Sequence, residues 1–459
     1  MAVQLDVVVG IQIGTHYNSL VCFFPYDETR YPSPTWDDPS TGKVQSKQRT
    51  IAVYSHNKVF QAFGHEAVKQ IQGQNNTNLL VLSNFVNDIF CSGIQVPKKV
   101  RAENGVMVSS FDLTSSVISC LIRNPNLRKI EPLKKRYVFT IPSRACEKHA
   151  EFLESAAKNA GLHKGQILVI PKAAAILHFC KHKHRAHADG KEIDPFIIGK
   201  PNVVLECEVE DNTKGFTVRD NSHTVYDVGI SILMLQEDDA IEIIYNSFEN
   251  EIILSKVQHN FEDLISQIVG KSVFDDFCQR NISDYHELLH TLHDKIKGPS
   301  TEIITFSLPA ELFALIEEQP KERIEKAIEK MNLVNKVYFF AGKCRIAPDV
   351  FQTLFMDTKK NVVQLLHKVL VDSGLKEKVN IILPGEFSNS VIFQDTIRRE
   401  FPDDCIITDE EEMATKGAAL YGHRPVKLIL KERLWNTAQV AVSVQRRKKR
   451  RRKHLCSVM

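Results

Sequence analysis

The stretch VVVGIQIGT (residues 7–15) places a run of β-branched residues directly before a Gly-Thr turn. Such a run predicts a buried strand, and residues 19–24 predict a second strand after the turn. A strand, a glycine turn and a second strand have the shape of a phosphate-binding hairpin, in which backbone N–H groups and a hydroxyl hold phosphate. Alone, the Gly14-Thr15 pair is weak evidence for such a site, so its neighbours along the chain decide its meaning.

Strand and helix patterns alternate farther along the chain. YVFTI (137–141) predicts a buried strand, and residues 152–160 repeat apolar side chains at helical spacing before Gly161. A short strand at 167–170 and a helix that begins at residue 173 follow. This alternation predicts an α/β protein built in layers.

Residues 181–195 predict a polar connection that contains His182, His184 and His187. No carboxylate or thiol completes a metal-ligand set at regular spacing in this segment. We therefore interpret it as a solvated loop.

Two other segments have clear local signals. Residues 25–49 are rich in Pro, Ser and Asp and predict a loop, which a strand pair at 50–54 and 58–62 follows. Pro348 is expected to open one long helix that ends at Gly374.

The composition is that of a globular protein. A length of 459 residues allows two to four domains, and 43% hydrophobic with 25% charged residues excludes disorder of the whole chain. The ten cysteines are spread without a C-x-x-C pair, which predicts reduced thiols in the cytosol or nucleus. The beginning of the chain lacks a basic signal-peptide region, and no apolar run approaches the ~20 residues that span a bilayer. We expect neither secretion nor a membrane-spanning segment.

The formal net charge of +3 hides an uneven distribution. Eight consecutive basic residues occupy 446–453, so residues 1–445 hold 51 basic and 56 acidic side chains, a charge of −5. The sequence predicts an acidic body with a strongly basic tail.

Several stretches in a fixed order resemble the actin-like ATPase superfamily, and within it the divergent type-12 branch of the 70-kDa heat-shock proteins. The resemblance covers about residues 5–425 and implies an α/β fold with two lobes, each with an actin-like sheet core flanked by helices, around a nucleotide cleft. It rests on VVVGIQIGT (7–15), FGHEA (63–67), RYVFTIPSRACEKHAEFLESAAKNAGL (136–162) with IPKAA (170–174), VYFFAGKCRIAPDVFQTLF (337–355) and NIILPGEFSNSVIFQDTIRREFPDDCIITDEEEMATKGAALYG (380–422).

The resemblance also implies a domain organisation. Lobe I is expected at 1–200 and lobe II at 201–425, with a return of the final helix to lobe I left open. A connector at 426–445 is too short for the β-sandwich substrate domain of peptide-binding heat-shock chaperones. A flexible basic tail at 446–459 completes the expected organisation.

The first phosphate loop departs from the family pattern. The family reads Asp-x-Gly-Thr there, and the Asp helps to organise hydrated Mg²⁺, whereas this chain has Gln12-Ile13-Gly14-Thr15. A neutral amide thus replaces the metal carboxylate, and the bulky His16 replaces the small hydroxyl that follows.

Two more family groups are changed. The carboxylate that faces the attacking water corresponds to Ile170, and the Asp of the second phosphate loop corresponds to Glu206. No glycine run follows Glu206, in agreement with only 20 glycines in the chain, so the backbone there lacks the close approach that phosphate binding needs. Instead, Glu208, Glu210 and Asp211 bring negative charge to that loop.

These departures predict a pseudo-ATPase, because phosphoryl transfer needs metal, water and phosphates held together. We expect no catalytic residue, no metal site and no required cofactor. Binding of ATP with Mg²⁺ through Gly14, Thr15, Lys343 and Gly385 stays open as an alternative, as part of a weak chaperone-like ATPase.

The last four residues, Cys456-Ser457-Val458-Met459, match a C-a-a-X box of the type that receives a farnesyl lipid on the cysteine. A single lipid chain binds membranes only marginally, and a polybasic patch supplies the second signal. The basic residues before the box are Arg446, Arg447, Lys448, Lys449, Arg450, Arg451, Arg452 and Lys453.

We therefore expect a non-catalytic scaffold or regulatory protein on the cytoplasmic face of a membrane, with the plasma membrane favoured, and in the cytoplasm. Its expected partners are an anionic membrane surface and unidentified proteins. A nuclear interaction protein directed by the same basic run is the alternative. No aromatic residue interleaves the run, so no specific nucleic acid is expected as a partner.

Overall fold

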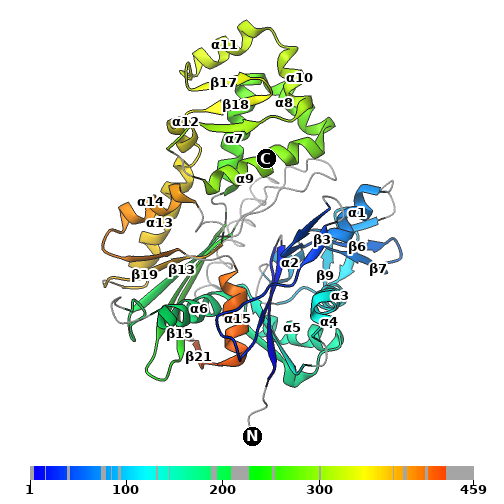
Figure 1. Cartoon of the computed structure of the whole chain (residues 1–459), viewed down its shortest axis with the longest axis vertical. Helices are drawn as coiled ribbons and strands as arrows, with labels where there is room; N and C mark the ends of the chain where they lie inside the picture. The colour runs from blue at the N-terminus through cyan, green and yellow to red at the C-terminus, as the bar shows by residue number, and fades with distance from the viewer. Residues whose placement is uncertain are drawn as a thin grey trace, which may run out of the picture.

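The computed structural model contains two large β-sheets with helices on their faces (Figure 1). Within the described residues, no helix combines the length and apolar character that crossing a bilayer requires. The structure describes residues 5–15, 17–38, 42–73, 79–83, 85–90, 95–130, 133–143, 145–187, 194–207, 227–250, 254–298, 301–375, 377–385, 390–408 and 412–430.

The first sheet has five strands in the order β12-β11-β1-β2-β5. Strands β1 and β2 form an antiparallel hairpin, whereas β1, β11 and β12 run parallel. Parallel strands covered on both faces are expected to be apolar throughout, and β1 is buried along almost its whole length. The strands are β1 (Val7–Ile13), β2 (Tyr17–Phe23), β5 (Lys47–Arg49), β11 (Lys135–Ile141) and β12 (Ile167–Pro171).

The second sheet has six strands in the order β20-β19-β13-β14-β15-β21. It begins with an antiparallel hairpin of β13 and β14 and adds β19 and β20 in parallel to β13. Five of its strands thus repeat the order and directions of the first sheet. The strands are β13 (Pro201–Cys207), β14 (Asp227–Leu235), β15 (Ile241–Asn250), β19 (Asn380–Leu383), β20 (Cys405–Thr408) and β21 (Leu428–Leu430).

Two helices, α6 (Lys172–His187) and α15 (Met413–His423), lie side by side between the sheets (Figure 1). Each follows the fifth strand of one sheet, and α15 packs onto β1, β2 and β11 of the other sheet. Glycines allow this contact: a Cβ on Gly10 would lie 2.1 Å from the Thr415 carbonyl oxygen, and one on Gly417 would lie 1.9 Å from that of Ala175. The ATKGA stretch (414–418) therefore brings backbone close to backbone.

Three apolar cores hold the layers together. One lies between the sheets around α6 and α15, and each sheet has another core on its outer face. The outer helices are α3 (Ser110–Ile122) and α5 (Glu147–Asn159) on the first sheet and α7 (Leu254–Val269), α13 (Met356–Asp372) and α14 (Val391–Glu400) on the second.

Each half carries an additional small sheet. The first has the order β7-β6-β8 beside α1, and the second has the order β16-β18-β17 in the subdomain at the top of Figure 1. These elements are β6 (Ala52–Ser55), β7 (Phe60–Phe63), β8 (Leu79–Leu82), α1 (His65–Gly73), β16 (Ile304–Ser307), β17 (Val337–Phe340), β18 (Lys343–Ile346), α8 (Lys271–Arg280), α9 (Ile282–Lys297), α10 (Ala310–Glu317) and α11 (Lys321–Lys330).

Short elements complete the described chain. They are β3 (Trp36–Asp38), β4 (Lys43–Gln45), α2 (Phe85–Phe90), β9 (Lys99–Arg101), β10 (Met107–Ser109), α4 (Pro125–Arg128), the 3₁₀ turn Lys164–Gln166 and α12 (Pro348–Thr353).

The sequence-based expectations for the α/β alternation and for the strand pair after residue 49 are confirmed. Three local expectations were wrong. The segment 25–49 contains β3, β4 and β5, helix α6 continues through His187, and the helix expected after Pro348 is divided into α12 and α13. The division falls at Leu354 and Phe355, whose buried side chains pack into the core of the second half.

Candidate functional site

The turn between β1 and β2 is the first part of the candidate site. A Cβ on Gly14 would lie 2.4 Å from the Tyr17 carbonyl oxygen, so this turn requires glycine. The Gly14 carbonyl oxygen accepts a hydrogen bond from Thr50 Oγ1 at 2.8 Å, and the buried Thr15 hydroxyl donates to Asn87 Oδ1 at 3.3 Å. Of the groups that the sequence offered to phosphate, the Thr15 hydroxyl is therefore hydrogen-bonded to a side chain of the protein. His16 lies outside the described residues.

Gln12 lies one residue before the end of β1. It pairs in register with Ser19 on β2 and with Thr140 on β11, and its side chain is partly buried. Its amide nitrogen lies 3.5 Å from the place that a Cβ on Gly14 would take. An uncharged amide thus stands beside the turn where the family pattern has a metal-organising carboxylate.

Ile170 lies on β12 beside Thr140 of β11 and is fully buried. It belongs to the core between the sheets, where Val8 and Val138 are also buried. An apolar side chain in this environment neither orients water nor accepts a proton, so this position contributes packing.

Glu206 is the second carboxylate position, near the end of β13, and only 7% of it is exposed. The hydroxyl of Ser143, in the loop after β11, donates a hydrogen bond to Glu206 Oε1. Ser143 Oγ accepts a hydrogen bond from the backbone N–H of Ala173 at 3.2 Å, and the Ser143 carbonyl oxygen accepts one from Asn246 Nδ2 at 3.2 Å. Glu206 and Asn246 belong to the second sheet and Ser143 to the first, so these hydrogen bonds join the two halves.

Sequence reasoning missed Ser143 and Asn246. Ser143 stands inside the quoted stretch IPSRAC, but nothing local indicates that its hydroxyl meets a residue 63 positions away. One local signal was available: Ser143 directly follows the proline that ends a buried strand. Such a residue lies at the carboxyl end of the strand, where functional groups of α/β sheets gather.

The remaining predicted nucleotide contacts are dispersed. Gly385 follows β19 of the second sheet, with a φ of +78° that favours glycine. Lys343 lies on β18, in the three-stranded sheet of the upper subdomain, and is exposed. The structure therefore gathers Gln12, Gly14 and Thr15 in one hairpin and places Lys343 on a separate sheet. Glu208, Glu210, Asp211, the basic run 446–453 and Cys456 lie outside the described residues.

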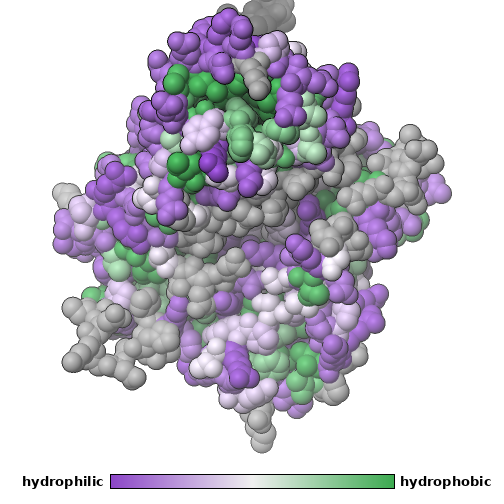
Figure 2. All heavy atoms as spheres, turned by 45° about the horizontal axis from the view of Figure 1, so that its top comes forward, coloured by the Kyte–Doolittle hydropathy of each residue, from purple (hydrophilic) through white to green (hydrophobic). Residues whose placement is uncertain are grey.

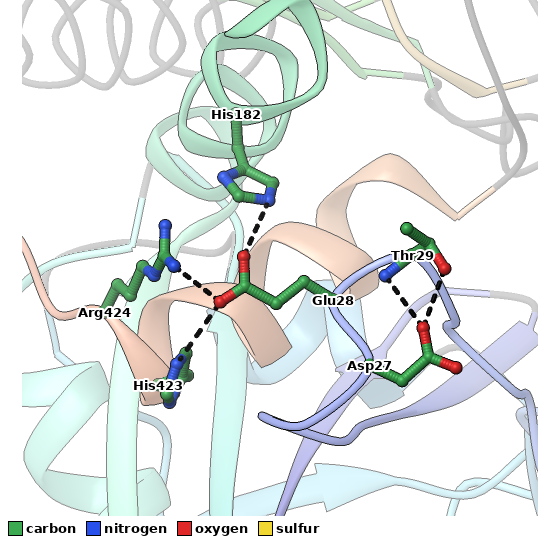
Figure 3. Close-up of polar contacts among 6 residues, drawn as sticks. All are labelled: Asp27, Glu28, Thr29, His182, His423 and Arg424. Carbon is green, nitrogen blue, oxygen red and sulfur yellow. Dashed lines mark hydrogen bonds and ion pairs between the residues drawn. The ribbon is translucent and has the colours of Figure 1, made fainter. Parts of the chain in front are cut away.

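A second polar cluster connects the segment between β2 and β3 to the two central helices (Figure 3). Glu28 accepts a hydrogen bond from Arg424, and its carboxylate lies 3.9 Å from His182 Nε2 on α6 and 3.8 Å from His423 Nε2 on α15. Burial and the charge of Arg424 lower the pKa of His423. Glu28 thus accepts a hydrogen bond from Arg424 and lies close to two histidine rings of the central helices.

Both halves have the same sheet order, a central helix and an added small sheet, and the two central helices pack together. This arrangement defines the class of protein: it is an actin-like ATPase fold with two lobes.

No family model matches the chain. Mouse heat shock 70 kDa protein 12A is 22% identical over 480 aligned residues, which cover 91% of this chain and 70% of that protein. The human protein of the same name is 20% identical with the same coverage. Over 91% of its length the chain is thus similar to a heat-shock-70 protein of type 12, as the sequence motifs predicted.

Proposed function

We propose that this protein is a non-catalytic scaffold or regulatory protein with an actin-like fold, which a farnesyl lipid and a basic tail attach to the cytoplasmic face of a membrane. The observation that carries the first half of this proposal is the burial of Ile170 at the position of the family's water-orienting carboxylate. Loss of such a group commonly costs orders of magnitude in rate.

Two more observations support the absence of hydrolysis. Gln12 removes a metal-organising charge, and the Glu206 carboxylate already accepts a hydrogen bond from Ser143. This hydrogen bond uses the Glu206 carboxylate to join the two halves. Relative to the family pattern, the chain lacks the carboxylates at positions 12 and 170 and the glycine run after Glu206, and phosphoryl transfer depends on such groups.

Titration calorimetry with Mg-ATP tests this half of the proposal. We expect no heat of binding at 100 µM nucleotide and no phosphate release above the buffer blank, each measured with freshly purified full-length chain. Micromolar affinity for Mg-ATP, or phosphate release above the buffer blank, would overturn it.

The second candidate function, a weak ATP-binding chaperone-like protein, has one observation in its favour. The turn at Gly14 and the positive φ at Gly385 keep backbone shapes that close approach of a nucleotide needs. Two results together would favour this candidate: the chain binds ATP without hydrolysing it, and a Gly14→Val variant that still folds loses this binding.

The membrane half of the proposal rests on the sequence of the tail. Eight cations next to an anionic leaflet supply several kcal/mol, at about 1 kcal/mol each, and a farnesyl chain at Cys456 supplies the hydrophobic part. Intact-mass spectrometry of protein purified from cells tests it: we expect a farnesyl adduct and loss of the three residues after Cys456.

Cell fractionation separates the two membrane signals. A Cys456→Ser variant and a variant with Arg450, Arg451 and Arg452 changed to Ala are both expected to move from the membrane to the soluble fraction. Unchanged membrane association of Cys456→Ser contradicts the lipid anchor, and accumulation of that variant in the nucleus favours a nuclear interaction protein.

A further inference from the structure

The upper subdomain presents one open face of its three-stranded sheet. Side chains alternate along a strand, and here Val337 and Cys344 point into the core while their neighbours point to solvent. On the open face, Phe340 is 74% exposed and Tyr338 is 36% exposed. Figure 2 shows apolar side chains gathered over this subdomain with hydrophilic ones around them. Two exposed aromatic residues side by side on a strand are costly to keep in water and are typical of a binding surface.

Two cations lie directly across from these aromatic residues. Arg345 of β18 pairs in register with Tyr338, and Lys343 pairs with Phe340. Both cations are exposed, and neither has an ion pair within the part of the chain that the structure describes. In contrast, Lys336 at the start of the same hairpin is bound to Asp349 at 2.6 Å. The face therefore combines apolar area with two uncompensated positive charges.

We propose that this face, formed by Tyr338, Phe340, Lys343 and Arg345, is a docking site for an acidic segment of a partner protein that also carries aromatic or aliphatic side chains. Carboxylates pair with the two cations, and apolar side chains cover the two rings. Charge-assisted hydrogen bonds to Arg and Lys and burial of Phe and Tyr are the contacts that dominate small interfaces. The proposal is independent of nucleotide binding and of the tail.

Charge argues against the other occupants. A second copy of the same face would bring like charges together, which costs several kcal/mol at an interface. The basic tail of this chain has the same sign as the face. A nucleic acid needs cations along its whole backbone, whereas this face offers two, Lys343 and Arg345. A short acidic peptide requires no more than the two cations present.

A selection experiment tests this proposal with the full-length protein. A phage library of random 12-residue peptides is selected on the wild type and in parallel on the Lys343→Glu/Arg345→Glu variant. We expect the wild type to enrich peptides that combine Asp or Glu with aromatic or aliphatic residues, and the reversed variant to lose them. Enriched peptides are then synthesised with a fluorescent label, and their affinity is measured by anisotropy.

The expected affinities follow from the chemistry of the face. Phe340→Ser and the charge-reversed variant each weaken binding at least tenfold, and binding weakens with added salt. The matched control is Lys99→Glu/Arg101→Glu, which reverses two exposed cations at the same spacing on β9, opposite the strand β10 that lacks aromatic residues. We expect this control to change binding less than twofold. All substituted side chains are exposed, so the variants keep the melting temperature of the wild type.

Four results would overturn the proposal. The first is a selection that yields no acidic peptides, and the second is equal binding of such peptides to wild type and to the charge-reversed variant. The third is tight binding of an oligo-dT strand that Phe340→Ser abolishes, which indicates a base-stacking platform. The fourth is a dimer in light scattering that the same variant dissociates, which indicates a second copy on this face.

Discussion

Gln12 and Glu206 occupy the same place in the two core sheets, yet their environments differ. Each is the sixth residue of a seven-residue strand that begins a hairpin. Gln12 is neutral and partly exposed beside a tight glycine turn, whereas Glu206 is buried and bonded to Ser143 of the opposite half. The loops after the fourth strands also correspond, as Pro142-Ser143 in one sheet and Pro384-Gly385 in the other.

The difference between Gln12 and Glu206 separates two kinds of position in a fold built from two similar sheets, those in the core and those at the strand ends. The side chains at core positions must fill a fixed volume, because a cavity or an extra group there lowers the free energy of unfolding by several kcal/mol. Strand-end positions contact whatever lies beyond the sheet, so their surroundings differ between the halves. In this chain the repeated strand order persists, while the polar groups at the strand ends join the halves to each other.

The largest expected effect comes from Ile170, a fully buried residue of the core between the sheets. Ile170→Glu puts a carboxyl group into the core between the sheets, and we expect it to lower the free energy of unfolding by about 4 kcal/mol or more. Urea denaturation followed by circular dichroism measures the loss. The control is Thr408→Glu on β20, which is the fourth residue of its strand, as Ile170 is of β12, but is partly exposed and should cost far less. Equal losses in the free energy of unfolding would show that the two strand positions are equally intolerant of a carboxyl group.

The hydrogen bonds between the halves give the next effect. Ser143→Ala removes the hydroxyl that donates a hydrogen bond to the buried Glu206 carboxylate, at an expected cost of about 2 to 3 kcal/mol. In a Ser143→Ala/Glu206→Gln double variant the cost should be smaller than the sum of the single costs, because the pair is coupled. Strict additivity in the urea midpoints contradicts the idea that these residues join the halves.

The two central helices give a pH-dependent effect. Burial, together with the charges of His182, Lys181 and Arg424, lowers the pKa of His178 from 6.5 to about 4. The unfolded chain therefore binds a proton that the folded chain excludes, so this histidine costs no stability above pH 7 and about 2 kcal/mol at pH 5. We expect His178→Gln to reduce the loss of stability between pH 7.5 and 5, and the exposed His163→Gln to leave it unchanged. An identical loss in wild type and His178→Gln assigns the acid sensitivity to other groups.

The smallest effect concerns the loop that corresponds to Ser143. Gly385 has a φ of +78° with open space around the position of a Cβ, so Gly385→Ala adds backbone strain without a clash and should cost about 1 kcal/mol. Gly10→Ala is the contrasting variant, since its Cβ meets the Thr415 carbonyl oxygen. Gly385→Asn, which tolerates positive φ, should recover part of the loss in a thermal melt.

Local patterns predicted much of this arrangement. The β-branched run at 7–15, YVFTI at 137–141 and the strand pair after residue 49 were expected and are present, because each depends on the alternation or burial of neighbouring side chains. The end of α6 and the division before α13 were missed. His182 and His187 look like loop residues by composition, but the helix continues through them because its other face packs against α15 and the second sheet.

The sequence by itself determined the strands, the glycine turn at Gly14 and the uncharged side chains at Gln12 and Ile170, since residue type alone carries that information. Only the tertiary structure decided that Ser143 bonds Glu206, that Gly10 and Gly417 admit α15, and that Lys343 stands beside Phe340 on an open face. Those contacts join residues that are distant in the sequence or belong to different strands. Their partners are fixed by the register of the sheets and the packing of helices, which no local pattern contains.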